Sequence, residues 1–394
     1  MCFTCVRVDV LKKCDIINYM KTAIFSLKIG RIFTILLMMF FASFSGCNPW
    51  GNPGPTPGPS PYHDPDILRD NINQKIERPA DWVRIVQDRE LFQLGVPCTT
   101  NSFGTFPSID GSTVLLPLAA EFGWQFLDLN NDNTRLFFQF STTHEAYLNL
   151  IFFPIAWNHN YHISTWLCEI SGHGYHHLYK QPDIILVTPP SADELNTANG
   201  NDVELIVKPI CYDSFVFITH VSNPIDSLSV EQVQKIYSGE ITNWSQVGGN
   251  NEKIVAFQRE AGSGSQTAME EIVMTGLKMM EAPMGWTIGG MANLIRKFTA
   301  EYQNAPQSIG YTYKYYVDRL YKSPDIKIIK INGIEPNDAN VRNFSYPFTV
   351  PYNGVIRSND VTNAGGKFLD WMLSEEGQRC IAQAGYVSLL SMEP

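Results

Sequence analysis

The residues best suited to chemistry in this 394-residue chain form one turn that holds an arginine, two glycines and two serines. Residues 258–265 read QREAGSGS, after an apolar run and before a helical pattern that starts near Ser265. The first N–H groups of a helix have no partner within it and carry partial positive charge, so they suit an anion. The Arg259 side chain adds a planar fork that binds two oxyanion oxygens at once. Together with the donors of Ser263, Gly264 and Ser265, it predicts an oxyanion site.

Two earlier turns repeat this pattern. Residues 109–122 read IDGSTVLLPLAAEF, which predicts a strand end, a Gly-Ser-Thr turn and a helix. Residues 140–147 read FSTTHEAY, which predicts another hydroxyl-rich turn between a strand and a helix. Ligands of open α/β sheets bind at the carboxyl ends of the strands. Three helix N-termini can therefore point at one anion, which amides and hydroxyl groups would hold with little formal charge.

Other chemistries fit these residues less well. A Ser-Gly-Ser turn can also be a helix cap without a ligand. The Walker pattern is absent because no Gly-Lys-Ser/Thr follows the turn, which disfavours a nucleotide site. Residues 151–182 contain five histidines that could bind Zn²⁺, but a surface loop inserted into the fold is the plainer interpretation. We expect no metal site, no cofactor and no catalytic residue.

The composition indicates a packed protein in which any anion site must be local. Hydrophobic residues make up 44% of the chain and charged residues 17%, which supports a folded core. The formal net charge of -10 disfavours nucleic acid as a partner and also repels a free anion. An anion site must therefore rest on local dipoles and one or two placed cations.

Four cysteines follow the N-terminal region, and the sequence leaves their pairing open: Cys98, Cys168, Cys211 and Cys380. Export would permit disulfides between them. Free buried thiols are equally compatible with the sequence.

The N-terminal region has the features of an export signal. Residues 32–44 form an uncharged apolar run that follows basic residues and precedes Ser-Gly-Cys47. The run is too short for a membrane span, which needs about 20 apolar residues. Its end resembles a bacterial lipobox, whose cysteine is acylated, although Phe44 stands where that pattern prefers leucine. We predict a signal and lipobox over 1–47 and a Pro/Gly tether over 48–80, which would anchor the protein in the periplasm or at the cell surface. An uncleaved anchor or a plain secretory signal is the alternative.

Apolar runs alternate with helical patterns in the remainder of the chain. Strands are expected over 136–140, 184–187, 215–218 and 326–331. A capping box at 229–232 opens a helix that should end near Gly239, and a second helix is expected over 363–384 with a break at Gly377. This alternation predicts the α/β class, with a mostly parallel sheet flanked by helices.

These segments resemble a known family, the phosphate-binding proteins of bacterial ABC uptake systems, which have the type II periplasmic binding-protein fold. The resemblance covers about residues 105–390 outside the His-rich segment. It rests on the three turns, on LSVEQVQKIYSGEITNWSQVGG at 228–249, and on SIGY at 308–311. The resemblance implies ligand contacts from Ser112, Thr113, Val114, Ser141, Thr142, Thr143, Arg259, Ser263, Gly264 and Ser265.

One departure from the family concerns the choice of ligand. Well-known members place an aspartate after the third strand, where it accepts a hydrogen bond from protonated phosphate. Here residues 187–190 read VTPP, and Thr188 is expected to line the pocket instead. The sequence therefore leaves open which tetrahedral oxyanion is bound.

The resemblance also implies two lobes joined by two crossovers. We expect the first lobe over 81–215 and 323–394, with the His-rich insertion at 151–182, and the second lobe over 216–322. The family's function is to capture phosphate between the lobes and deliver it to an ABC permease, without enzymatic activity, and we expect a monomer. A phosphatase-like enzyme and a surface module for anion sensing or adhesion are the alternatives.

Overall fold

The computed structural model describes residues 76–92, 106–138, 140–152, 181–298 and 305–390. Cys47 with the predicted signal, most of the tether, most of the His-rich segment, Cys98 and Cys168 lie outside these residues. The chain divides into two units, Met1–His63 and Asp64–Pro394, and all the described residues belong to the second. Among the described helices, none has the length and apolar character needed to cross a membrane.

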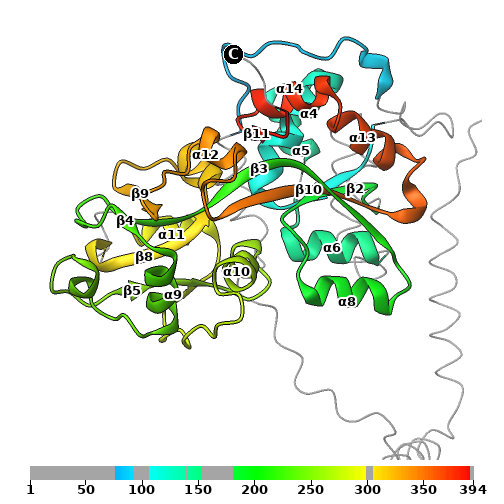
Figure 1. Cartoon of the computed structure of the whole chain (residues 1–394). Coiled ribbons are helices and arrows are strands. Elements are labelled where there is room, and N and C mark those ends of the chain that lie inside the picture. The colour runs from blue at the N-terminus through cyan, green and yellow to red at the C-terminus, as the bar shows by residue number, and fades with distance from the viewer. Residues whose placement is uncertain (1–75, 93–105, 139, 153–180, 299–304, 391–394) are drawn as a thin grey trace, which may run out of the picture. The chain divides into compact units, whose positions relative to one another are not determined.

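A long strand, β3 (Leu205–His220), runs through both halves of the described fold (Figure 1). Its first part pairs with β10 (Thr349–Arg357), and its last part pairs with β8 (Ser308–Tyr313) and β9 (Ile326–Ile331). The predicted strand 215–218 is confirmed as a segment of β3, and its four side chains are fully buried. We call the elements around the first part of β3 the first lobe, and those around its last part the second lobe.

The first lobe holds its sheet between two layers of helices (Figure 1). Its strands lie in the order β1–β2–β10–β3, and a further strand, β11, pairs with β3. Helices α6 and α8 cover one side of the sheet, whereas α13 and α14 cover the other. The bounds are β1 Ile109–Gly111, β2 Ile184–Val187, β11 Val387–Ser388, η1 Arg89–Leu91, η2 Thr113–Leu115, α4 Leu116–Leu127, α5 Asn131–Phe137, α6 Thr143–Ile151, α8 Ala192–Gly200, η8 Ser358–Asp360, α13 Ala364–Met372 and α14 Glu375–Gln383.

The second lobe is built on β8, which pairs with β3 and with β5. A separate two-stranded sheet, β6 with β7, carries the predicted anion turn, and α12 lies beside β3 and β11. The bounds are β4 Ser227–Leu228, β5 Val255–Ala256, β6 Gln258–Arg259, β7 Thr287–Ile288, α9 Val230–Ser238, η4 Trp244–Val247, α10 Gly264–Ala268, η5 Met269–Val273, α11 Met291–Arg296, η6 Ala305–Gln307, η7 Tyr316–Leu320 and α12 Asp338–Arg342.

The described strands pair in both senses, so the prediction of mostly parallel sheets is wrong in that detail. Four pairs are parallel: β1–β2, β4–β9, β5–β8 and β6–β7. Every pair that involves β3 or β10 is antiparallel. Strand β3 carries the chain from the first lobe into the second, and β10 belongs to the later segment that returns to the first lobe. The two long strands therefore run in opposite directions. Because β9 pairs with β3 and β4, it lies with the second lobe, beyond the expected boundary at residue 322.

Residues 136–138 and 140 do not form the predicted strand. Residues 131–137 form helix α5 instead, because the Asn130 side chain caps it by accepting a hydrogen bond from the Asn133 amide at 2.8 Å. Inside this helix, the Thr134 hydroxyl accepts a hydrogen bond from the Trp124 indole at 2.9 Å, which fixes α5 on α4. A short segment rich in apolar residues fits a buried helix end as well as a strand.

The other local predictions are confirmed, with one shift. Strands β2 and β9 have the predicted bounds, and Ser229 and Gln232 form the predicted reciprocal cap of α9, which ends at Gly239. The break in the C-terminal helix falls before Ser374, whose hydroxyl caps α14, and not at Gly377. Gly377 serves close packing, since a Cβ atom there would lie 2.2 Å from the Trp371 carbonyl oxygen.

Two of the four cysteines with open pairing are described, Cys211 and Cys380, and both are free and buried. Burial raises the pKa of both thiols, so they remain protonated at neutral pH. They therefore pack in the core as small apolar side chains.

Candidate functional site

Arg259 lies at the end of β6 and is nearly buried, with 8% of its surface exposed. Its side-chain Nε donates to the carbonyl oxygen of Ile288 at 2.9 Å, and its backbone amide donates to the Tyr311 hydroxyl at 3.0 Å. Burial lowers the pKa of Arg259, but a guanidinium group stays protonated in proteins. Among the described residues, no group accepts a hydrogen bond from its two terminal nitrogens and no carboxylate pairs with it. A fixed, buried cation with free donors is suited to an oxyanion.

The turn after Arg259 forms as the sequence predicts. Ser263 caps α10, because its hydroxyl accepts a hydrogen bond from the Gln266 amide at 3.1 Å. The Gly264 carbonyl oxygen accepts a hydrogen bond from the Tyr313 hydroxyl at 3.0 Å. Ser265 is 5% exposed, and in the described part of the chain its hydroxyl has no hydrogen-bond partner. Ser263 thus holds the turn, and Ser265 keeps a donor for a ligand.

The first-lobe turn after β1 also keeps free donors. The Ser112 amide donates to the Leu186 carbonyl oxygen at 2.8 Å, whereas its buried hydroxyl contacts no hydrogen-bonding group of the described residues. The Thr113 hydroxyl lies 2.5 Å from the Tyr316 hydroxyl. The Val114 carbonyl oxygen accepts a hydrogen bond from the Tyr386 hydroxyl at 2.6 Å. The backbone N–H group is the donor that Val114 could offer to an anion.

The turn before α6 is only partly free. The amide and hydroxyl of Ser141 both donate to the Asp110 carboxylate, at 2.8 Å and 2.6 Å, so Ser141 belongs to a structural network. Burial raises the pKa of Asp110, and these hydrogen bonds oppose the rise. Thr142 is exposed and has φ 91 and ψ 169, a region that favours glycine and stores strain at functional sites. Thr143 is buried, and its hydroxyl is unpaired among the residues that the structure describes.

The two lobes meet at Gly264. A Cβ atom added there would lie 2.7 Å from the Thr188 hydroxyl oxygen and 2.9 Å from that of Thr143. A Cβ atom on Gly262 would contact the His144 side chain at 3.8 Å, so the turn lies against the start of α6, as Figure 1 also shows for α10 and α6. Thr188 is 1% exposed, and its hydroxyl has no hydrogen bond of adequate geometry within the described chain. The contacts at Gly264 thus bring Thr143 and Thr188 to the turn that carries Ser265. We call these three residues, together with Ser112 and Arg259, the polar cluster, because each has a side-chain donor without a partner among the described residues.

The tyrosines around this cluster were not predicted from the sequence. Tyr311, Tyr313 and Tyr316 come from the end of β8 and the start of η7, and each places its hydroxyl on an anion turn or on Arg259. A signal was present, because buried tyrosine hydroxyls need partners and the segment 309–316 is rich in tyrosine. Nothing in the sequence showed which turns they would meet.

The close approach at Gly264 gives a testable expectation. In the Gly264→Ala variant, the new methyl group must displace the Thr188 and Thr143 hydroxyls, and overpacking of this kind costs about 1–3 kcal/mol. We expect oxyanion binding, measured by titration calorimetry, to weaken accordingly. The matched control is Gly200→Ala, where the added methyl group meets no atom within 4 Å. Equal affinity in both variants would remove Gly264 from the site.

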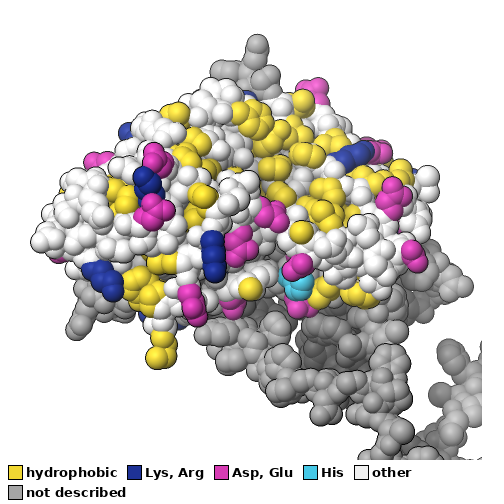
Figure 2. All heavy atoms as spheres, turned by 60° about the horizontal axis from the view of Figure 1, so that its bottom comes forward, with side chains coloured by type: hydrophobic (Ala, Val, Ile, Leu, Met, Phe, Trp, Pro, Cys, Tyr) yellow, Lys and Arg dark blue, Asp and Glu magenta, His cyan; other side chains and the backbone are white. Residues whose placement is uncertain are grey.

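No group of three or more His, Cys, Asp or Glu side chains in the described ranges could hold a metal ion. On the face in Figure 2, lysine and arginine side chains stand apart from one another among acidic ones and form no basic patch. With a net charge of -10 and no basic patch on this face, Arg259 and the donors near it are the groups in the described site that are suited to an anion.

Comparison with known proteins shows the family to which the chain is similar. The family described as the PBP superfamily domain matches residues 159–376, which include the Arg259 turn. The phosphate-binding protein PstS of Borreliella burgdorferi is 27% identical over 185 residues, which are 45% of this chain and 64% of that protein. Its namesake from Bacillus subtilis is 26% identical over 171 residues, or 43% and 53% of the two chains. The chain thus matches less than two thirds of the length of either relative.

A solved structure from Clostridium perfringens extends the similarity to the fold. That protein is described as a phosphate ABC transporter substrate-binding protein and was solved with bound phosphate. It is 26% identical to this chain, with a TM-score of 0.51, and the superposition covers 72% of this chain and 98% of that one. The family match and this fold identify the chain as a member of the PBP superfamily, with the two-lobed α/β architecture expected from its sequence.

Proposed function

We propose that this chain binds phosphate or a similar tetrahedral oxyanion at the polar cluster around Arg259. The observation that carries the proposal is Arg259 itself, a buried cation with two unpaired terminal nitrogens and no carboxylate partner among the described residues. A buried charge without a partner is unfavourable, so the arrangement is best understood as a site completed by an anion. The relatives from Borreliella burgdorferi and Bacillus subtilis are named as phosphate-binding proteins, which makes phosphate the first candidate.

The unpaired hydroxyls of the cluster bear on the choice among oxyanions. Ser112, Thr143, Thr188 and Ser265 can each donate one hydrogen bond and accept others. Thr188, which stands where an aspartate was expected from the family, can therefore accept a hydrogen bond from the proton of a phosphate or donate to an unprotonated oxyanion. We propose that hydroxyls replace a carboxylate acceptor here, which permits phosphate, arsenate and sulfate as candidate ligands.

The proposal extends to the cellular role. We propose that the protein is exported, anchored to a membrane through acylated Cys47, and delivers its ligand to an ABC permease as a monomer without enzymatic activity. Detergent-phase partitioning tests the anchor: the wild-type chain expressed in bacteria should enter the detergent phase, and Cys47→Ser should stay in the aqueous phase. Equal partitioning of both would contradict lipid attachment at Cys47.

A thermal-shift panel with phosphate, arsenate, sulfate, molybdate and phosphate esters tests the binding function. We expect inorganic phosphate to raise the Tm of the chain, because a ligand that binds only the folded state stabilises it by mass action. Stabilisation by phosphate with no release of phosphate from the esters would support a binding protein. Turnover of the esters would favour the phosphatase alternative, and no shift with any oxyanion would refute the proposed site.

A further inference from the structure

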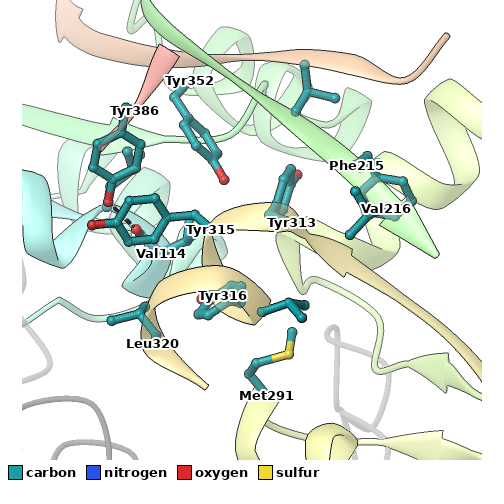
Figure 3. Packing of buried hydrophobic residues seen from close by; sticks show 14 of the residues in the cluster. Val114, Phe215, Val216, Met291, Tyr313, Tyr315, Tyr316, Leu320, Tyr352 and Tyr386 are labelled. Atoms are coloured by element: carbon teal, nitrogen blue, oxygen red, sulfur yellow. Dashed lines mark hydrogen bonds between the residues drawn. The ribbon is translucent and has the colours of Figure 1, made fainter. Parts of the chain in front are cut away.

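Tyr316 connects the two lobes at the candidate site. It is the first residue of η7, three positions after β8 ends, and only 6% of its surface is exposed. Its hydroxyl lies 2.5 Å from the Thr113 hydroxyl in the first-lobe turn, a contact between residues 203 positions apart in the sequence. Figure 3 shows Tyr316 on η7, next to the segment that carries Tyr313 and Tyr315.

Tyr316 also lies in the electrostatic field of Arg259. Burial raises the pKa of Tyr316, while the Thr113 hydrogen bond and the charge of Arg259 oppose that rise. The reciprocal effect is present too, since after burial Tyr316 has the largest effect on the pKa of Arg259. The Tyr316 hydroxyl therefore contacts the first-lobe donor Thr113 and is electrostatically coupled to the second-lobe cation.

Counting protons in the hydroxyl pair shows what this contact can do. Each hydroxyl has one proton, and the bond between Thr113 and Tyr316 uses one of the two. The other proton is left to donate elsewhere. If Tyr316 donates to Thr113, the Thr113 proton points away from Tyr316 and is available to an anion at its turn. Hydrogen bonds in such a chain also polarise one another, which strengthens the terminal donor.

The same stretch of chain holds the other anion turn. The Tyr313 hydroxyl donates to the Gly264 carbonyl oxygen at 3.0 Å. Two tyrosines three positions apart thus contact the two turns that would hold the anion, one turn from each lobe. The spacing between the turns is therefore set by the end of β8 and the start of η7.

We infer that Tyr316 is a positioning residue of the oxyanion site, which orients the Thr113 hydroxyl as a donor to the ligand and holds the first-lobe turn against Arg259. This inference rests on the proposed function, because it assigns a role within the same site. It predicts that Thr113 and Tyr316 act as one unit in binding, although only Thr113 would touch the anion.

A double-mutant cycle on phosphate affinity tests the inference. We expect Tyr316→Phe to weaken phosphate binding about tenfold, the effect of one well-placed hydrogen bond. Thr113→Val should weaken binding by at least as much, and the double variant should be no weaker than Thr113→Val, because the pair shares one function. Thr113→Ser keeps the hydroxyl and should bind nearly as the wild type does. Tyr346→Phe is the matched control, since it removes a buried hydroxyl that donates to the Phe215 carbonyl oxygen outside the site.

The outcomes separate the inference from the proposed function. If the wild-type chain binds no phosphate in calorimetry, the proposed function fails. If the wild type binds and Tyr316→Phe binds equally well, only the role of Tyr316 fails. Additive losses in the cycle would also overturn it, because they would mean that Tyr316 acts independently of Thr113. A Tyr316→Phe chain too unstable to titrate, combined with equal affinity of Thr113→Val and Thr113→Ser, would exclude the hydroxyl pair from binding.

Discussion

Arg259→Ala should lose about 2–5 kcal/mol of oxyanion binding free energy, as when one partner of a buried charge-assisted pair is removed. The Nε bond to Ile288 and the burial of the side chain hold the guanidinium in place before the ligand arrives, so little ordering is needed on binding. Without it, the remaining donors are neutral hydroxyls and amides. These donors would have to hold the anion in a chain whose net charge is -10.

Two further variants make the Arg259 result specific. Arg259→Lys keeps the charge but loses the planar fork, so its affinity should lie between those of the wild type and Arg259→Ala. Arg296→Ala removes an exposed arginine of α11 in the same lobe and should leave binding unchanged. Titration calorimetry with phosphate measures all three. An Arg259→Ala chain with wild-type affinity would place the anion elsewhere.

A second large effect is expected at the junction of the lobes, where Asp213 is buried. Its carboxylate accepts hydrogen bonds from the Ser214 amide at 2.7 Å, the Tyr352 hydroxyl at 2.8 Å and the Tyr315 amide at 3.2 Å. These hydrogen bonds connect the part of β3 that leaves the first lobe to the residues that follow β8. Asp213 also lines a cavity of about 70 Å³. Figure 3 shows the surrounding tyrosines, in which Tyr315 and Tyr386 stack at 4.1 Å.

The environment of Asp213 determines whether its contribution to the free energy of unfolding rises or falls with pH. Burial raises its pKa from 3.8 to about 6, and the three hydrogen bonds and the nearby Lys314 only partly oppose this. The folded chain therefore binds more protons at this residue than the unfolded chain between about pH 4 and pH 6. The contribution of Asp213 to stability falls as the pH rises through this window, by about 3 kcal/mol at 1.36 kcal/mol per pH unit.

Urea unfolding of the wild type and of Asp213→Asn from pH 4 to pH 7 tests this expectation. Other carboxyl groups titrate in the same range, so the difference between the two proteins is the relevant quantity. The free energy of unfolding of the wild type should fall relative to Asp213→Asn by about 2 kcal/mol over this range, because part of the total effect lies below pH 4. Asp370→Asn, at an exposed position, is the matched control for the removal of one carboxylate. A constant difference between wild type and Asp213→Asn would contradict a raised pKa at the junction.

The features predicted from the sequence are those decided by neighbouring residues. The reciprocal cap of Ser229 and Gln232 spans three positions, and the Ser263 cap of α10 likewise depends on one turn of chain. The Arg259 turn could therefore be predicted from local spacing alone. The two-lobed class followed from the resemblance to a family, not from periodicity.

The features that were missed depend on contacts between distant residues. Asp110 engages both donors of Ser141, and Tyr316 meets Thr113 across 203 positions, so neither pairing could be read from local spacing. The antiparallel pairing arises because β3 and β10 run in opposite directions between the same neighbours, a property of the whole topology. The helix over 131–137 was missed because a short apolar run does not distinguish a strand from a buried helix end.

A crystal structure of the chain grown with phosphate tests the central claim most directly. We predict a tetrahedral ligand whose oxygens accept hydrogen bonds from the Arg259 terminal nitrogens and from hydroxyls of both lobes, among them Ser112, Thr143 and Ser265. Phosphate bound at another place, or Arg259 terminal nitrogens paired with a carboxylate of the chain, would contradict the account.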